Sequence, residues 1–120
     1  MKPSGIFATV GDTRNVKSIA GIGALALAAT GTNQATALQL SADLNQITSS
    51  VVGGGVRLPA TEEGAEIWIR NDSGQTIAIY PFETSGTTIN AGAASVSLPT
   101  AKTMVLKALS PTIWASLLSA

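Results

Sequence analysis

The sequence predicts a mainly β protein, in which a small antiparallel β-sandwich or barrel follows one short helix and an extended N-terminal arm. In the second half, apolar residues recur at every second position in short runs, and turn residues separate these runs. The first part differs, because it has neither sustained alternation nor a long helical stripe. The predicted parts are the arm at residues 1–35, the short helix at 36–52 and the β-sandwich domain at 53–120.

The arm contains the apolar stretch SIAGIGALALAATG, which is open to three interpretations. A secretory signal peptide would explain why Lys17 precedes it, but Asp12 and the glycines at 21 and 23 are unusual for one. A membrane-spanning helix needs roughly 20 apolar residues, more than this stretch offers. We favour the third interpretation, an extended arm that lies on a partner, because its small side chains bury too little surface to fold alone.

The short helix is predicted from the spacing of apolar residues in TALQLSADLNQITSSV. Leu40, Leu44, Ile47 and Val51 recur at the intervals that place side chains on one face of a helix. The three glycines at 53–55 would end it. We expect this face to pack on the β-domain or on its own copies around a symmetry axis.

Four runs define the main strands of the β-domain: GAEIWIRN, QTIAIYPF, TMVLKAL and TIWASLL. Each places aliphatic side chains on one face, such as Ile67 with Ile69 and Ile113 with Leu117. The segment NDSGQ at 71–75 has the Asn, Asp, Ser and Gly residues that favour a turn, so it predicts a hairpin.

The opposite face of these strands carries the large rings of Trp68, Tyr80, Phe82 and Trp114. A solvated face would normally be polar, so four rings indicate a second covered surface. That surface is either a second core within the sandwich, a contact between subunits, or a platform that binds carbohydrate.

Composition argues against several function classes. The chain has no His and no Cys, which removes the usual general base, the thiolate nucleophile and the commonest metal ligands. Its formal net charge is zero, with scattered Lys and Arg, whereas nucleic-acid binding needs clustered positive charge. Glu62, Glu63 and Glu66 indicate a solvated turn more than a metal site. We therefore expect no enzyme activity, cofactor, metal, nucleic-acid partner or membrane partner.

Residues 36–120 resemble a β-domain of virion structural proteins in tailed bacteriophages. The resemblance rests on a GV-x-LP start, a strand that ends in Asn, an I-x-I-Y-P run, a T-I-N segment and a last strand with Trp. The matching residues here are Gly55, Val56, Leu58, Pro59, Asn71, Ile79, Tyr80, Pro81, Thr88, Ile89, Asn90 and Trp114. Residues 1–35 carry no assignable motif.

The resemblance implies a head decoration (cement) protein that stabilises the capsid from its exterior. It implies the major capsid protein and further copies of the chain, as a homotrimer, as partners. Two alternatives remain open: a tail, baseplate or fibre-attachment protein, and a carbohydrate-binding module that reads sugars with Trp68, Tyr80 and Trp114. The candidate oligomer or capsid interface comprises Phe7, Ile19, Ile22, Leu25, Leu27, Trp68, Tyr80, Phe82 and Trp114.

Overall fold

The computed structural model describes residues 23–82, 87–90 and 92–120, and these residues form strands, turns and loops without a helix. The strands are β1 (Ala24–Ala29), β2 (Leu38–Gln39), β3 (Leu44–Ser50), β4 (Gly55–Arg57), β5 (Glu66–Asn71), β6 (Ile77–Tyr80), β7 (Thr88–Ile89), β8 (Val96–Leu98), β9 (Lys102–Ser110) and β10 (Ile113–Leu118).

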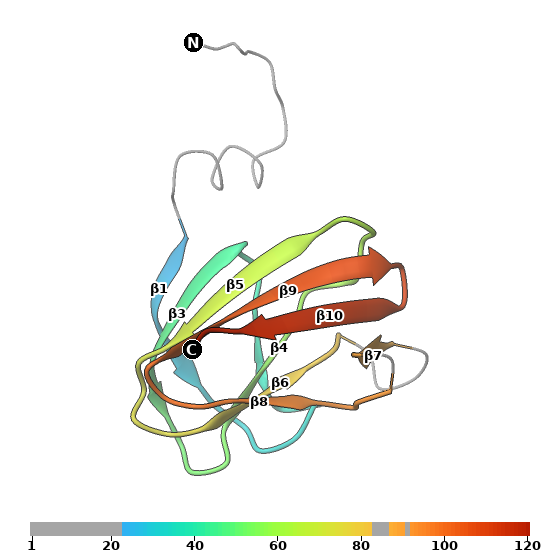
Figure 1. Cartoon of the computed structure of the whole chain (residues 1–120). Coiled ribbons are helices and arrows are strands. Elements are labelled where there is room, and N and C mark those ends of the chain that lie inside the picture. Colours follow the sequence, from blue (N-terminus) through green and yellow to red (C-terminus); the bar gives the residue numbers. More distant parts are fainter. Residues whose placement is uncertain (1–22, 83–86, 91) are drawn as a thin grey trace, which may run out of the picture.

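The strands form two sheets, and from β1 to β9 the chain passes from one sheet to the other after each strand. The larger sheet, sheet A, has the order β1-β3-β5-β9-β10-β7, and the smaller one, sheet B, has the order β2-β4-β6-β8. The pairs β1–β3, β3–β5, β2–β4 and β4–β6 are parallel. Three turns (β1–β2, β3–β4 and β5–β6) therefore stack in one direction, as in a β-solenoid (Figure 1).

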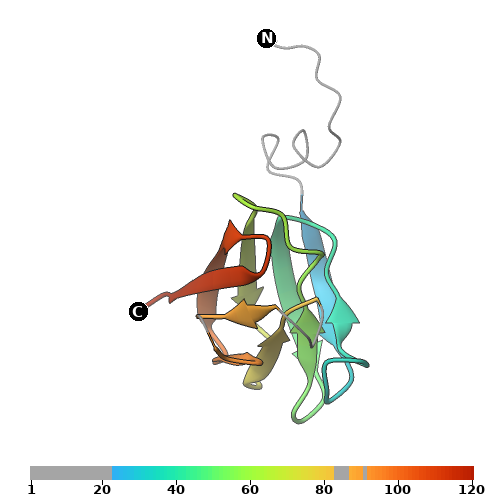
Figure 2. The same ribbon diagram turned by 90° about the vertical axis from the view of Figure 1, so that its right-hand side faces the viewer.

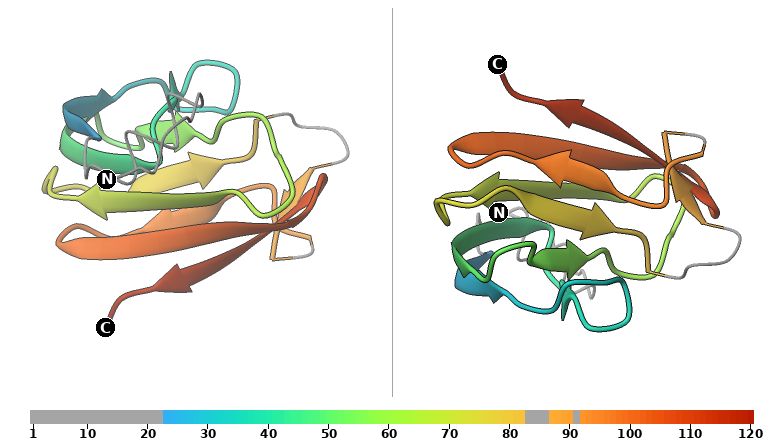
Figure 3. Two further views of the ribbon diagram at one scale, coloured as in Figure 1. Left: turned by 90° about the horizontal axis from the view of Figure 1, so that it is seen from above. Right: turned by 90° about the horizontal axis from the view of Figure 1, so that it is seen from below.

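A fourth turn, made of β8 and β9, runs in the opposite direction, and β10 and β7 follow β9 in sheet A. β8 pairs antiparallel with β6, and β9 pairs antiparallel with β5. Figure 3 shows the order of sheet A from β1 through β3, β5 and β9 to β10. In Figure 2, β1 and β10 lie on opposite sides of the molecule.

The predicted antiparallel β-sandwich or barrel is wrong, because the fold is a four-turn β-solenoid with mixed sheets. Alternation of apolar residues identifies a strand but does not indicate the direction of its neighbour. The segment NDSGQ does turn the chain, but it joins β5 of sheet A to β6 of sheet B and makes no hairpin. A parallel pair needs a return connection, which the opposite sheet supplies here.

The predicted helix at 36–52 is also wrong, because this segment contains β2 and β3. Leu40 and Ile47 are buried as expected, but Val51 is 49% exposed. In β3 the inward positions are Asn45 and Ile47. A polar residue at an inward position hides the two-residue period of the strand and leaves only the apparent helical spacing.

Residues 24–30, which the sequence places in the arm, are part of the solenoid. β1 pairs in parallel with β3, and Thr30 forms a bridge with Gly55, so this part of the chain belongs to the first solenoid turn. Positions 1–22, with Phe7, Ile19 and Ile22, lie outside the described residues. For them the arm stays a prediction.

The core lies between the two sheets and is almost entirely aliphatic. It comprises Ala29, Leu40, Ile47, Val56, Leu58, Ile67, Ile69, Ile77, Ile79, Ile89, Leu98, Met104, Leu106, Ala108 and Trp114. The aliphatic faces predicted for β5, β6 and β9 are confirmed by this set.

The orientation predicted for β10 is wrong. Trp114 is 0% exposed, and Leu117, expected inside, is 71% exposed. The pairing of β10 with β9 shifts register between Ile113 and Trp114. The indole Nε1 of Trp114 donates a hydrogen bond to Thr61 Oγ1 at 2.9 Å, so the ring is buried without leaving its N–H unpaired.

Candidate interaction surface

A row of apolar side chains crosses the outer face of sheet A. In the register of the sheet, Leu44 pairs with Trp68, Trp68 with Val105, and Val105 with Leu117. Paired residues lie side by side on the same face, so these four side chains are neighbours on β3, β5, β9 and β10. We call Leu44, Trp68, Val105 and Leu117 the apolar row.

The apolar row is open to solvent at two of its members. Trp68 is 43% exposed and Leu117 is 71% exposed. Leu44 and Val105 are half-buried between them. Exposed single apolar residues are common on protein surfaces, but residues aligned across four adjacent strands form a continuous patch, which more often marks a contact site.

On β5 and β9, polar side chains flank the row on both sides, two residues away along each of these strands. On one flank, Glu66 pairs with Lys107 in the register, and Lys107 Nζ lies 3.8 Å from Glu66 Oε1. On the other flank, Arg70 pairs with Gln46 and Thr103. Each of these flanks carries one cation with an anion beside it, because Arg70 Nε lies 2.8 Å from Asp72 Oδ1 as Lys107 lies near Glu66.

A hydrogen bond to Glu66 on the neighbouring flank fixes the orientation of the Trp68 ring. Its indole Nε1 donates a hydrogen bond to Glu66 Oε2 at 2.7 Å, and the same carboxylate is close to Lys107. The ring is therefore already oriented in the free chain, which lowers the entropy cost of a contact made with it.

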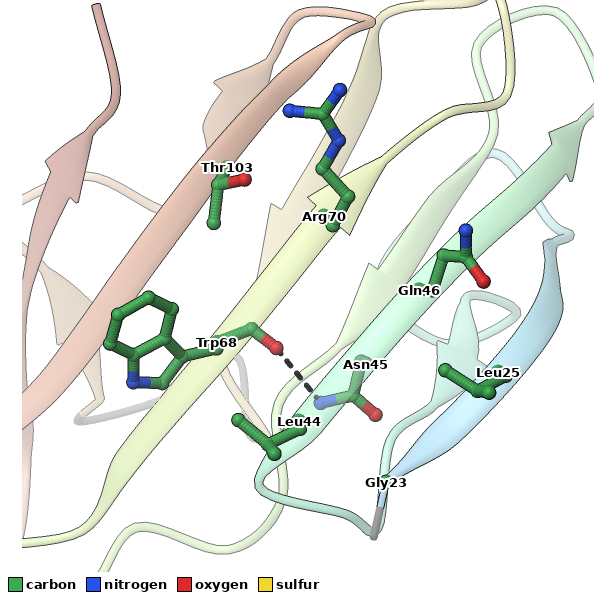
Figure 4. A pocket seen from close by; sticks show the side chains of 8 residues that line it. All are labelled: Gly23, Leu25, Leu44, Asn45, Gln46, Trp68, Arg70 and Thr103. Carbon is green, nitrogen blue, oxygen red and sulfur yellow. Dashed lines mark hydrogen bonds between the residues drawn. The ribbon is translucent and has the colours of Figure 1, made fainter. Parts of the chain in front are cut away.

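A groove of about 470 Å³ runs beside the row, lined by Gly23, Leu25, Leu44, Asn45, Gln46, Trp68, Arg70 and Thr103. Figure 4 shows Trp68 and Leu25 on opposite sides of β3, with Arg70 further along β5. Leu25 is 70% exposed, so the groove has apolar side chains at both edges. Gln46, Arg70 and Thr103 form one polar wall.

Asn45 ties two strands together at the base of this groove. Its Nδ2 donates to Ala42 O at 2.9 Å and to Trp68 O at 3.2 Å, the second of which is drawn in Figure 4. Its Oδ1 is buried and, within the described part of the chain, has no hydrogen-bond partner. Such an oxygen costs free energy, which the two amide donors offset.

The second flank has a defined charge state. Asp72 accepts hydrogen bonds from Gln46 Nε2 at 3.2 Å and from Arg70 Nε at 2.8 Å. These bonds, that from Gln46 first, lower the pKa of the Asp72 carboxyl below its usual value. The carboxylate therefore stays ionised at neutral pH beside the Arg70 guanidinium.

The structure does not bring the predicted interface residues together on one face. Leu25 and Trp68 line the same groove, whereas Leu27 packs against the core. Tyr80 belongs to sheet B, where its hydroxyl lies 3.4 Å from Thr32 O. The Phe82 ring lies 5.5 Å from the Arg57 guanidinium carbon. Trp114 is inside the core, so no platform of three exposed rings exists among the described residues.

Three members of the apolar row escaped prediction. The sequence pattern places Leu44 on the predicted helical stripe, gives Val105 no role and puts Leu117 on the aliphatic face of its strand. Only the register of neighbouring strands aligns these residues with Trp68, and register across parallel strands cannot be read from local alternation.

The described residues contain no group of three or more His, Cys, Asp or Glu side chains placed to hold a metal ion. Within the same residues, no helix has the length and apolar character to cross a membrane. The chain matches no protein-family model, no curated protein and no solved structure.

Proposed function

We propose that this chain is a structural protein of a tailed-bacteriophage virion: a head decoration protein, without enzyme activity, on the exterior of the capsid. Its partners are the major capsid protein and further copies of itself, as a homotrimer. The observation that carries the proposal is the pre-oriented apolar row on the outer face of sheet A. The resemblance of residues 36–120 to virion β-domains supports the virion setting.

The mechanism is stabilisation by mass action. A protein that binds the assembled shell and not its separated subunits lowers the free energy of the shell, and the effect grows with occupancy. A homo-oligomer binds through several contacts at once, so weak individual contacts give tight attachment. The chain needs no catalytic group for this proposed role.

The carbohydrate-binding alternative loses its main argument. A platform for sugars needs exposed rings on one face, but Trp114 is buried and Tyr80 belongs to the other sheet. No observation favours the tail, baseplate or fibre-attachment role over the head. The test of the proposal therefore also distinguishes these positions.

The test is the location of the chain in purified particles. Particles of the phage that encodes it are purified on a density gradient, and their peptides are identified by mass spectrometry. Gold-labelled antibody raised against the purified chain then locates it by electron microscopy. We expect peptides in the particle fraction and label on the head. Label on the tail would favour the alternative role, and absence from particles would overturn the proposal.

A further inference from the structure

We propose that the apolar row is the contact between copies of this chain, each copy covering the row of the next. This inference deepens the proposed function, because it names the surface by which the homo-oligomer forms. The occupant is a second copy, and three features of the outer face of sheet A support this choice.

The first feature is the direction of the row. It runs across the strands of sheet A, and therefore along the direction in which the solenoid turns stack. Neighbouring strands are about 4.8 Å apart, so four members span roughly 14 Å. A copy with its stacking direction parallel to the first presents an equally long row, and the two rows can meet along their full length.

The second feature is the arrangement of charge on the flanks. A rotation that relates two copies about an axis parallel to the row keeps each residue at its own strand level. It also brings one flank of the first copy opposite the other flank of the second. Arg70 and Glu66 lie on opposite flanks of the same strand, β5. Any such rotation therefore places Arg70 opposite the partner's Glu66, so unlike charges meet.

The third feature is the neutrality of the surface. The whole chain has a formal net charge of zero, and each flank pairs its cation with an anion. Two copies approach without net repulsion, whereas a strongly acidic or basic partner finds no matching field. A cyclic homo-oligomer, a trimer included, repeats one contact between its copies, so the row and its two flanks supply both sides of that contact.

The first experiment is sedimentation equilibrium of the full chain over a concentration series. We expect the unmodified chain to associate reversibly. Trp68→Lys and Leu117→Lys should each weaken association about tenfold or more, because each places a charge within an apolar contact. Leu109→Lys is the matched control: Leu109 is an exposed leucine on the same strand as Val105, four residues away. It should leave association unchanged.

Folding of each variant is checked by circular dichroism and thermal unfolding. Leu117 is more exposed than Trp68, so Leu117→Lys keeps the test available if Trp68→Lys does not fold. Association of both folded row variants at the strength of the unmodified chain would overturn the inference.

A charge exchange tests the relative placement of the copies. Arg70→Glu and Glu66→Arg should each weaken association, because like charges then face each other across the contact. The double variant should restore it. Four residues of strand separate these positions by roughly 13 Å, so restoration cannot come from a new ion pair within one chain. Failure of the double variant to recover would overturn the parallel arrangement.

The outcomes separate this inference from the proposed function. A chain that is monomeric at all concentrations, but whose row variants are lost from particles, would show that another protein covers the row. That result would overturn self-contact and leave the virion role standing. A chain that associates through the row but is absent from particles would support self-contact and overturn the virion role.

Discussion

The two tryptophans belong to the same sheet but occupy opposite environments. Trp114 is fully buried and bonded to Thr61, whereas Trp68 is 43% exposed and bonded to Glu66. The sequence predicts that both rings point away from the aliphatic face. That prediction fails at Trp114 because a register shift at the start of β10 turns the largest side chain of the strand inward. Alternation alone carries no sign of such a shift.

Fluorescence quenching distinguishes the two rings. In Trp114→Phe the remaining indole is Trp68, and we expect acrylamide to quench it readily. In Trp68→Phe the remaining indole is Trp114, which should be protected until the chain unfolds. Equal quenching of the two variants in their folded states would contradict the assigned burial.

The Asp72 carboxylate gives a prediction about pH. Its folded pKa is lowered from the ordinary 3.8 by hydrogen bonds from Gln46 and then Arg70. A lowered folded pKa gives stability that is complete above the unfolded pKa and is lost as pH falls through the folded value. The contribution is small because the group is solvent-exposed.

An NMR titration of the Asp72 carboxyl tests whether these two hydrogen bonds lower its pKa. We expect a pKa below 3.8 in the intact chain, and a rise toward that value in Gln46→Ala and in Arg70→Ala. An unchanged Asp72 pKa in both variants would show that these two bonds do not set it.

At the scale of elements, the corner between β5 and β6 shows which features of the fold the sequence predicts and which it does not. The residues NDSGQ correctly predict a turn, because Asn, Asp, Ser and Gly favour one. They do not indicate which strands the turn joins. Asn71 is buried there, and its Nδ2 donates to Gln75 O and Leu98 O at 2.7 and 2.9 Å. Its Oδ1 accepts hydrogen bonds from the amide and hydroxyl of Ser73.

Asn71→Ala should destabilise the fold by roughly 3 kcal/mol, because it leaves buried carbonyl groups without donors. Ser73→Ala removes only a partly exposed hydroxyl and should cost less than about 1 kcal/mol. Urea unfolding of both variants provides the measurement. A loss at Asn71 no larger than that at Ser73 would contradict a structural role for this side chain.

At the scale of the whole molecule, the strands after residue 53 are predictable from the sequence, whereas β1 to β3 and the path of the chain between strands are not. The aliphatic faces around Ile67, Ile79 and Leu106 were found because burial on one face of a strand leaves a two-residue period. The parallel stacking was missed because it depends on contacts between residues far apart in sequence. The apolar row was missed for the same reason, since its four members come from four strands.

The central claim is that the outer face of sheet A is covered when the protein does its work. Hydroxyl-radical footprinting with mass spectrometry tests this claim on gradient-purified particles and on the dilute free chain. Trp114 should be oxidised slowly in both samples and so reports that the fold is intact. We expect Trp68 to be oxidised rapidly in the free chain and at least several-fold more slowly in the particle. Equal oxidation of Trp68 in the two samples would contradict the central claim.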